Sequence, residues 1–260
     1  MADNRPIGLF DSGVGGLSVL CEIKKVLPRE SFIYLADQKN VPYGTKSKKV
    51  LNNLTLRITK FLLKFDIKML VVACNTASCY SVDFLRNNFN LPIVGVVPAV
   101  KPAVKLSKKG KITIMSTSAT AKSTYLKNLI AKFSSAKNVL SLGCDGLEDS
   151  VENLNYKKIN SLLDEYVKRA NSFESDVIIL GCTHFPFLKN DIQKRAIKGT
   201  KIIDSGKAIA SRVKFLLKQN NMIAAKKTKD LFFTTLNRKK FSNVASTLLK
   251  YKVLAQKASI

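Results

Sequence analysis

The stretch MLVVACNT, Met69 to Thr76, decides the fold because a related stretch, VIILGCTH, follows at residues 177–184. Each consists of a short aliphatic run, a cysteine and compact polar residues. Aliphatic runs of this length are typical of strands buried in parallel sheets. Two further pairs match at similar separations: IGLFDSG (7–13) with ITIMSTS (112–118), and IVGVVPA (93–99) with KIIDSGK (201–207). The repeat predicts two similar α/β halves.

Outward from these stretches, aliphatic runs alternate with longer segments of helical periodicity. We expect strands at residues 7–10, 32–36, 69–73, 93–97, 111–115, 139–143, 177–181 and 201–204. We expect helices at residues 16–26, 47–64, 77–88, 122–133, 156–171 and 207–220. Such alternation builds βα units around a mostly parallel sheet. The predicted fold class is therefore α/β, with two pseudosymmetric halves.

Cys74 and Cys182 take equivalent positions in the two halves, each just beyond a predicted strand. Ligands in such sheets bind beyond the carboxyl ends of the strands, so a site between the halves would have one thiol on each wall. The two cysteines could be small buried hydrophobic residues. They could also bind a metal, although Cys79 and His184 complete no convincing ligand spacing. A third interpretation is a pair of acid–base groups on opposite faces of one carbon, which would invert a stereocentre.

The residues after each cysteine favour the third interpretation. Asn75 and Thr76 follow Cys74, and Thr183 and His184 follow Cys182. They stand where helices are expected to begin, and backbone N–H groups and the helix dipole favour anions there. The same environment lowers the pKa of a cysteine. A carboxylate substrate would suit both walls.

Two other polar groups have both a structural and a chemical interpretation. Asp11 begins DSGVGG at the end of the first predicted strand, where it could cap a helix or move a proton of a nearby thiol. The glycine spacing does not match the dinucleotide-binding pattern, because Ser18 occupies the place of its last glycine. His184, the single histidine, could be held in the core by one hydrogen bond. If Cys182 is catalytic, the imidazole can relay a proton or stabilise the thiolate.

Composition narrows the class of protein. The chain has 260 residues, 46% of them hydrophobic, which is enough to fill real cores. Its formal net charge is +26, but the basic residues are dispersed along the chain without interleaved aromatic residues, so we expect solvated lysines and no specific nucleic-acid partner. Five scattered cysteines favour reduced thiols over a disulfide framework. With no membrane-length apolar run and no signal-peptide pattern, we expect a cytoplasmic location and no membrane partner.

Four motifs together resemble the glutamate racemases of bacterial cell-wall synthesis: FDSGVGGLSVL (10–20), DQKNVPYGTKS (37–47), VVACNTAS (71–78) and LGCTHFPFL (180–188). The similarity runs in the same order and at similar spacing from Ile7 to about Lys218. It implies an isomerase that uses no cofactor and no metal, with two cysteines in a cleft between two pseudosymmetric α/β domains. It also implies glutamate as the substrate, and a supply of the D-amino acid for peptidoglycan and hence for cell shape.

The resemblance also implies the roles of individual residues. Cys74 would remove the α-proton of D-glutamate with the assistance of Asp11. Cys182 would remove that of L-glutamate with the assistance of His184. Glu152 aligns with a further catalytic carboxylate and Asp37 with a supporting one. The substrate contacts implied by the same motifs are Asp11, Ser12, Tyr43, Gly44, Asn75, Thr76, Thr117, Thr120, Thr183 and His184.

By the same resemblance, residues 1–97 plus 206–260 would form one domain and residues 98–205 an inserted second domain, and a homodimer is compatible with it. The chain departs from the family pattern in three places, one of which is Cys79, a residue that we interpret as packing where a smaller residue is usual. CDGLEDSVEN (144–153) has acidic residues and a serine where apolar residues and a proline are usual, and Ser116 stands where glycine is common. A racemase for aspartate or another amino acid, a degenerate racemase and a basic nucleic-acid-binding protein are the alternatives.

Overall fold

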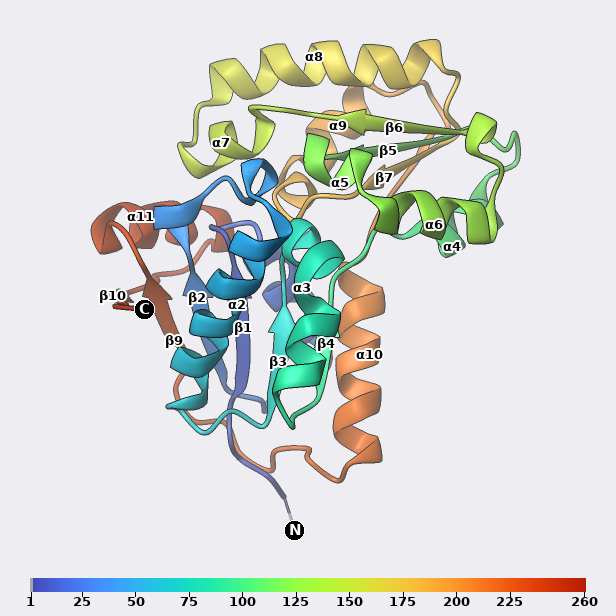
Figure 1. Cartoon of the computed structure of the whole chain (residues 1–260). Coiled ribbons are helices and arrows are strands. Elements are labelled where there is room, and N and C mark those ends of the chain that lie inside the picture. The colour runs from blue at the N-terminus through green and yellow to red at the C-terminus, as the bar shows by residue number, and fades with distance from the viewer. Residues whose placement is uncertain (1) are drawn as a thin grey trace. The chain divides into compact units, whose positions relative to one another are not determined.

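The computed structural model describes residues 2–260 (Figure 1). Its contacts divide the chain into two compact units. Unit 1 consists of residues 2–96 together with 206–260, and unit 2 consists of residues 97–205. Each unit has its own sheet and its own hydrophobic core, so each is described separately below.

Among residues 2–260, no helix combines the length and the apolar character needed to cross a membrane.

Unit 1 is built on a six-stranded sheet with the order β10-β9-β2-β1-β3-β4. Its strands are β1 (Ile7–Asp11), β2 (Phe32–Ala36), β3 (Met69–Val72), β4 (Ile93–Gly95), β9 (Leu231–Thr234) and β10 (Ala255–Lys257). All neighbouring strands run parallel, and in the centre Leu9 lies opposite Tyr34 of β2 and Val71 of β3. The three central strands are buried along their whole length, which explains their continuous aliphatic sequences.

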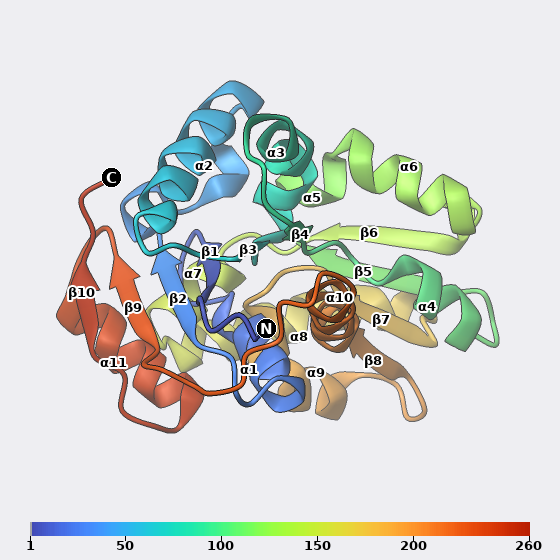
Figure 2. The same cartoon turned by 90° about the horizontal axis from the view of Figure 1, so that it is seen from below.

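Helices cover both faces of this sheet. They are α1 (Leu17–Val26), α2 (Lys48–Leu63), α3 (Asn75–Asn88), α10 (Gly206–Gln219) and α11 (Arg238–Leu249), with 3₁₀ turns η1 (Gln38–Asn40) and η2 (Tyr43–Thr45). Within unit 1, Figure 2 shows α2 and α3 on one face and α1, α10 and α11 on the other. Helix α2 begins after Ser47, whose Oγ accepts a hydrogen bond from Val50 N, and it buries Leu51, Ile58 and Leu62 at helical spacing.

A buried ion pair connects three distant segments of unit 1. The Nζ of Lys68 lies 2.6 Å from Oε2 of Glu30, and both side chains are almost completely buried. The same ammonium donates to the carbonyl oxygens of Asp3 and Met222, and the second Glu30 oxygen accepts from Ala224 N. A buried charge without a partner is strongly unfavourable, so this arrangement depends on every member being present.

Unit 2 contains a four-stranded parallel sheet with the order β6-β5-β7-β8. Its strands are β5 (Ile112–Ser116), β6 (Val139–Gly143), β7 (Val177–Leu180) and β8 (Lys201–Asp204). Its helices are α4 (Val100–Leu106), α5 (Ser118–Lys122), α6 (Thr124–Phe133), α7 (Leu147–Glu152), α8 (Tyr156–Ser172) and α9 (Lys189–Arg195), with 3₁₀ turns η3 (Ala136–Asn138) and η4 (Phe185–Leu188). Strands β5 and β7 lie at its centre and are fully buried.

The predicted α/β class with mostly parallel sheets is confirmed, and each predicted strand overlaps an observed one. The helix predicted at residues 122–133 is confirmed by α6, which begins two residues later, at Thr124. Ser123 has an extended backbone and its Oγ accepts from Leu126 N, so the chain forms α5 before it and α6 after it. The helix predicted at residues 77–88 begins earlier, at Asn75. The sequence analysis did not identify β9, β10, α4, α7, α9 and α11.

Candidate active site

Three sequence-predicted residues meet at the carboxyl edge of the unit 1 sheet. Asp11 ends β1, Asp37 follows β2, and Cys74 stands just beyond β3. These strands are neighbours, with β1 between β2 and β3. Both carboxylates are completely buried and the thiol is 5% exposed. Unit 1 therefore places two carboxylates and one thiol where parallel sheets commonly bind ligands.

Ser12 connects the thiol to the first carboxylate. Its Oγ donates to Oδ1 of Asp11 at 2.9 Å and lies 4.0 Å from the sulfur of Cys74. Gly16, at the start of α1, permits this close packing: a Cβ at that position would lie 2.8 Å from Cβ of Asp11 and 2.9 Å from the hydroxyl of Tyr34. The glycine is required by this close approach to the carboxylate-bearing strand end.

The first turn of α3 provides hydrogen-bond donors directly after the thiol. Cys74 occupies the N-cap position, and Asn75 and Thr76 are 4% and 3% exposed. The Nδ2 of Asn75 is buried and has no hydrogen-bond partner among the described residues. An unpaired buried amide costs free energy that a bound acceptor would recover. Together with the helix dipole, this donor makes the start of α3 suitable for a carboxylate.

Asp37 also holds Tyr43 in place within unit 1. The hydroxyl of Tyr43 donates to Oδ2 of Asp37 at 2.8 Å, and the same carboxylate accepts from Asn40 and Thr235. Burial raises the pKa of Asp37, and these hydrogen bonds oppose the change. Burial and the charge of Asp37 raise the pKa of Tyr43 well above its usual value, so its hydroxyl stays protonated. Gly44 follows it in η2 and is half-buried.

Unit 2 also has three buried residues just beyond the strand ends of its own sheet, here one threonine and two cysteines. Thr117 follows β5, Cys144 follows β6, and Cys182 stands just beyond β7. All three are buried, and β5 lies between the other two strands. Thr117 caps α5, since its Oγ1 accepts from Thr120 N at 3.2 Å, and it also donates to the hydroxyl of Thr120 at 3.1 Å. The sequence analysis assigned no role to Cys144, whose pKa is raised by burial and by the nearby Cys182.

The unit 2 thiol is the first of three polar groups that are linked in a chain. The sulfur of Cys182 lies 3.6 Å from Nδ1 of His184, and Nε2 of His184 lies 2.7 Å from Oε1 of Glu152. The three residues are 5%, 3% and 5% exposed, and Thr183, between the first two, is 5% exposed. Glu152 comes from a different element, the end of α7. The thiol, imidazole and carboxylate are thus held together away from bulk water.

The electrostatics of this chain determine the protonation of the histidine. Burial alone would lower the pKa of His184, but the hydrogen bonds with Cys182 and Glu152 raise it well above its usual value. Burial raises the pKa of Cys182, and the hydrogen bond to His184 opposes the change. A protonated imidazole can donate to a carboxylate through one nitrogen and to a thiolate through the other.

The departure CDGLEDSVEN forms the turn and helix that position Glu152. Gly146 precedes α7 with a φ of +80°, a conformation that favours glycine. Glu148 and Asp149 occupy the first turn of α7, where the helix dipole favours negative charge. Glu148 also contributes to Cys182, whose pKa is raised first by burial and further by this carboxylate. The sequence analysis noted the departure but not this electrostatic effect.

Within residues 2–260, no group of three or more histidine, cysteine, aspartate or glutamate side chains is arranged to hold a metal ion. The predicted substrate-contact residues gather instead at the two sheet edges described above. The unit 1 set offers carboxylate, hydroxyl and amide groups, and the unit 2 set offers hydroxyl groups and one imidazole.

Comparison with known proteins shows which protein family the chain belongs to. Residues 17–213 match the family model described as Asp/Glu/Hydantoin racemase. The chain belongs to this racemase family. A glutamate racemase from Clostridium novyi (strain NT) is 40% identical over 250 residues, which cover 94% of this chain and 96% of that protein.

Solved structures agree with this assignment. A glutamate racemase from Bacillus anthracis has a TM-score of 0.87 and 31% identity, covering 99% of this chain and 98% of its own. A glutamate racemase from Escherichia coli, solved with L-glutamate and the activator UDP-MurNAc-Ala, has a TM-score of 0.86 and 33% identity, covering 97% of both chains. The similarity therefore includes both units of this chain.

Proposed function

We propose that this chain is an isomerase that interconverts L-glutamate and D-glutamate, with Cys74 and Cys182 as the two acid–base groups. One observation carries the proposal: each unit has a buried thiol beyond a strand end, connected through one side chain to a carboxylate. In unit 1 the connection runs through Ser12 to Asp11, and in unit 2 it runs through His184 to a glutamate. The names of the relatives support glutamate as the substrate.

The proposed reaction is a proton exchange at one carbon. A thiolate removes the α-proton, so that a C–H bond breaks, an S–H bond forms and the electron pair stays on the carbon and its carboxylate. The second thiol then donates its proton to the opposite face, where a new C–H bond forms. Cys74 acts as the base toward D-glutamate and Cys182 toward L-glutamate. The sulfur atoms return to their starting protonation states by exchange with solvent.

The α-proton is weakly acidic, so the site must stabilise the charge that develops when it leaves. Preorganised donors in a water-excluded site supply such stabilisation. The residues proposed to hold the substrate are Asp11, Ser12, Tyr43, Gly44, Asn75, Thr76, Thr117, Thr120, Thr183 and His184. All of them except Gly44 are buried, and the unpaired amide of Asn75 is directly available for a substrate oxygen. Glu152 and Asp37 hold two of these groups in place.

The wider setting follows from the resemblance and is part of the proposal. The product D-glutamate would be used in the cytoplasm for peptidoglycan, and so for cell shape. Residues 1–97 plus 206–260 and residues 98–205 would act as two domains, with one substrate molecule meeting both thiols. A homodimer remains compatible with this assignment.

The test is chiral analysis of purified, chelator-treated protein incubated with L-glutamate in D₂O, without added pyridoxal phosphate. The proposal expects D-glutamate that carries deuterium at the α-carbon. L-aspartate in a parallel reaction separates glutamate specificity from a broader activity. Folded protein that produces neither inversion nor deuterium exchange with glutamate would contradict the proposal, and inversion of aspartate alone would change the substrate.

A further inference from the structure

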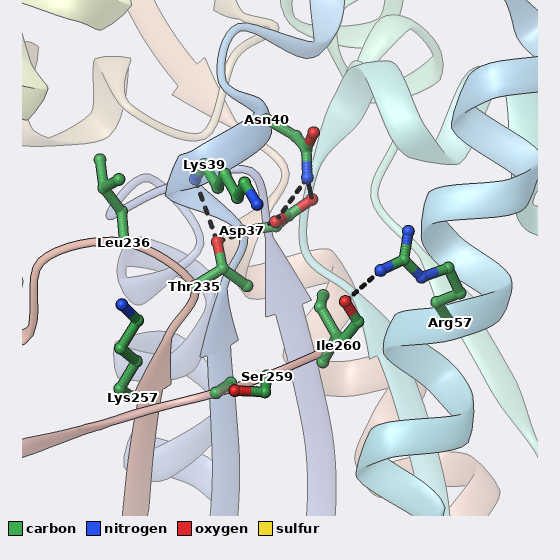
Figure 3. Close-up of a pocket in the computed structure, with 10 residues that line it drawn as sticks. Asp37, Lys39, Asn40, Arg57, Thr235, Leu236, Lys257, Ser259 and Ile260 are labelled. Carbon is green, nitrogen blue, oxygen red and sulfur yellow. Dashed lines mark hydrogen bonds between the residues drawn. The ribbon is translucent and has the colours of Figure 1, made fainter.

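Unit 1 contains a pocket that the proposed reaction does not use. Its volume is about 690 Å³, and it lies among η1, α2, the end of β9 and the segment that includes β10 (Figure 3). The residues that line it are Asp37, Lys39, Asn40, Arg57, Thr235, Leu236, Lys257, Ala258, Ser259 and Ile260. Pockets of roughly 300–1,000 Å³ are the usual size for small-molecule sites.

The lining is positively charged. Lys39, Arg57 and Lys257 come from three different elements and surround the same cavity (Figure 3). Neither lysine has an ion-pair partner among residues 2–260, and Arg57 donates to the carbonyl oxygen of Ile260. Concave surfaces lined by one sign of charge concentrate counter-ions. The pocket therefore favours an anion.

The one carboxylate in the lining, Asp37, is turned toward protein donors. Its oxygens accept hydrogen bonds from Tyr43, Asn40 and Thr235. Arg57, on the far side of the pocket, lies close enough to favour its ionised form. Asp37 thus contacts the pocket and the hydroxyl of Tyr43 at the same time, and it connects the pocket to a proposed substrate contact.

We propose that this pocket binds a small organic phosphate and that its occupancy weakens substrate binding through the Asp37–Tyr43 hydrogen bond. The lining has three cationic side chains and one carboxylate, so a ligand with a single carboxylate would leave positive charge unpaired, whereas a phosphate group carries close to two charges and three acceptor oxygens. Arginine and lysine are the side chains that most often bind phosphate. The exposed Leu236 and the partly buried Ile260 can contact the organic part. The binding of a phosphate to this pocket does not depend on the proposed function, whereas its effect on racemisation rests on that function.

The effect on the substrate site has a direct electrostatic cause. A phosphate that pairs with Arg57 removes part of the positive field that keeps Asp37 ionised. The carboxylate then becomes a weaker acceptor for the hydroxyl of Tyr43, which loses its fixed position. Tyr43 is proposed to hold substrate and not to exchange protons, so the expected effect falls on KM.

Binding is tested by calorimetric titration of the full chain with inorganic pyrophosphate at constant ionic strength. We expect saturable binding of one pyrophosphate per chain, and roughly tenfold weaker binding when both lysines of the pocket are neutralised in K39Q/K257Q. The matched control is K64Q/K252Q, which removes two exposed lysines outside the pocket and should change the affinity less than twofold. Binding of pyrophosphate that does not saturate, or an affinity that falls equally in both double variants, would overturn the proposed site.

Coupling is tested by initial rates with and without saturating pyrophosphate. We expect KM for glutamate to rise at least twofold with little change in kcat, and K39Q/K257Q to keep its basal rate but lose the response. An unchanged KM with retained binding would overturn the coupling. If the protein shows no racemisation at all, the proposed function fails, while the titration still decides whether the pocket binds phosphate.

Discussion

Replacing Glu152 with glutamine tests the chain of groups around Cys182. Glu152 Oε1 lies 2.7 Å from Nε2 of His184, and both side chains are almost fully buried. Glutamine keeps the shape and an acceptor oxygen but removes the charge. A charge-assisted hydrogen bond then becomes a neutral one, which reduces its contribution by about 1–1.5 kcal/mol. If His184 stabilises the thiolate of Cys182, that loss is expected to lower kcat/KM roughly tenfold.

The decrease should be equal in both directions, because two enantiomers have the same free energy and the equilibrium constant of a racemase is one. The pKa of His184 should also fall toward its usual value of 6.5. Because the folded-state pKa is raised, this histidine stabilises the fold fully below about pH 6.5. That contribution is lost as the pH rises through the raised pKa. The free energy of unfolding of E152Q should therefore fall less over the same pH range.

The assay is an NMR titration of the imidazole, combined with racemisation rates in both directions. His184 is the single histidine, so its ring signals need no assignment. D149N is the matched control, because Asp149 is an exposed carboxylate on the same helix and should leave the pKa of the imidazole unchanged. An imidazole that titrates at its usual value in the unmodified protein, or a pKa unaffected by E152Q, would refute the reasoning.

Three further predictions follow from the described contacts. C74A and C182A should each abolish racemisation in both directions while circular dichroism remains unchanged; full activity in either variant would contradict the two-thiol assignment. K68M should lower the free energy of unfolding by about 3–5 kcal/mol in urea titrations, because it leaves a buried carboxylate unpaired. Adding E30L should restore only part of the loss, because it removes the unpaired charge but also the acceptor of Ala224 N. G16A should cost about 1–3 kcal/mol and reduce kcat/KM, because the new methyl group has no space beside the carboxylate that ends β1; unchanged stability and rate would show that the helix can shift.

The central strands could be predicted from the sequence because burial on both faces leaves a continuous aliphatic pattern. Strand β10 has no such pattern, since Gln256 and Lys257 are exposed and its place depends on backbone pairing with β9. The start of α6 was predicted two residues too early because a serine in a helical pattern, such as Ser123, can be a cap or an interior residue. Only its backbone conformation distinguishes the two.

Some residues of the candidate site could likewise be predicted from the sequence, and others could not. Asn75 and Thr183 could be placed from the sequence because each is next to a cysteine at a strand end. The contact between Asp37 and Thr235 joins residues 198 positions apart, so no local sequence pattern could predict it. Glu148 was noted only as a departure, because its effect on the nearby thiol depends on how α7 is oriented.

Unit 1 is formed from two separate segments of the chain, which affects the order in which the two units can fold during synthesis. Domains generally fold as units while the chain leaves the ribosome. Residues 97–205 carry all four strands of their sheet in one continuous segment, whereas the sheet begun by residues 2–96 lacks β9 and β10 until the final part of the chain emerges. The segment synthesised first is thus completed last. Asp37 receives its hydrogen bond from Thr235 only at that point, so the group of side chains at the carboxyl edge of the unit 1 sheet is completed after the group in unit 2.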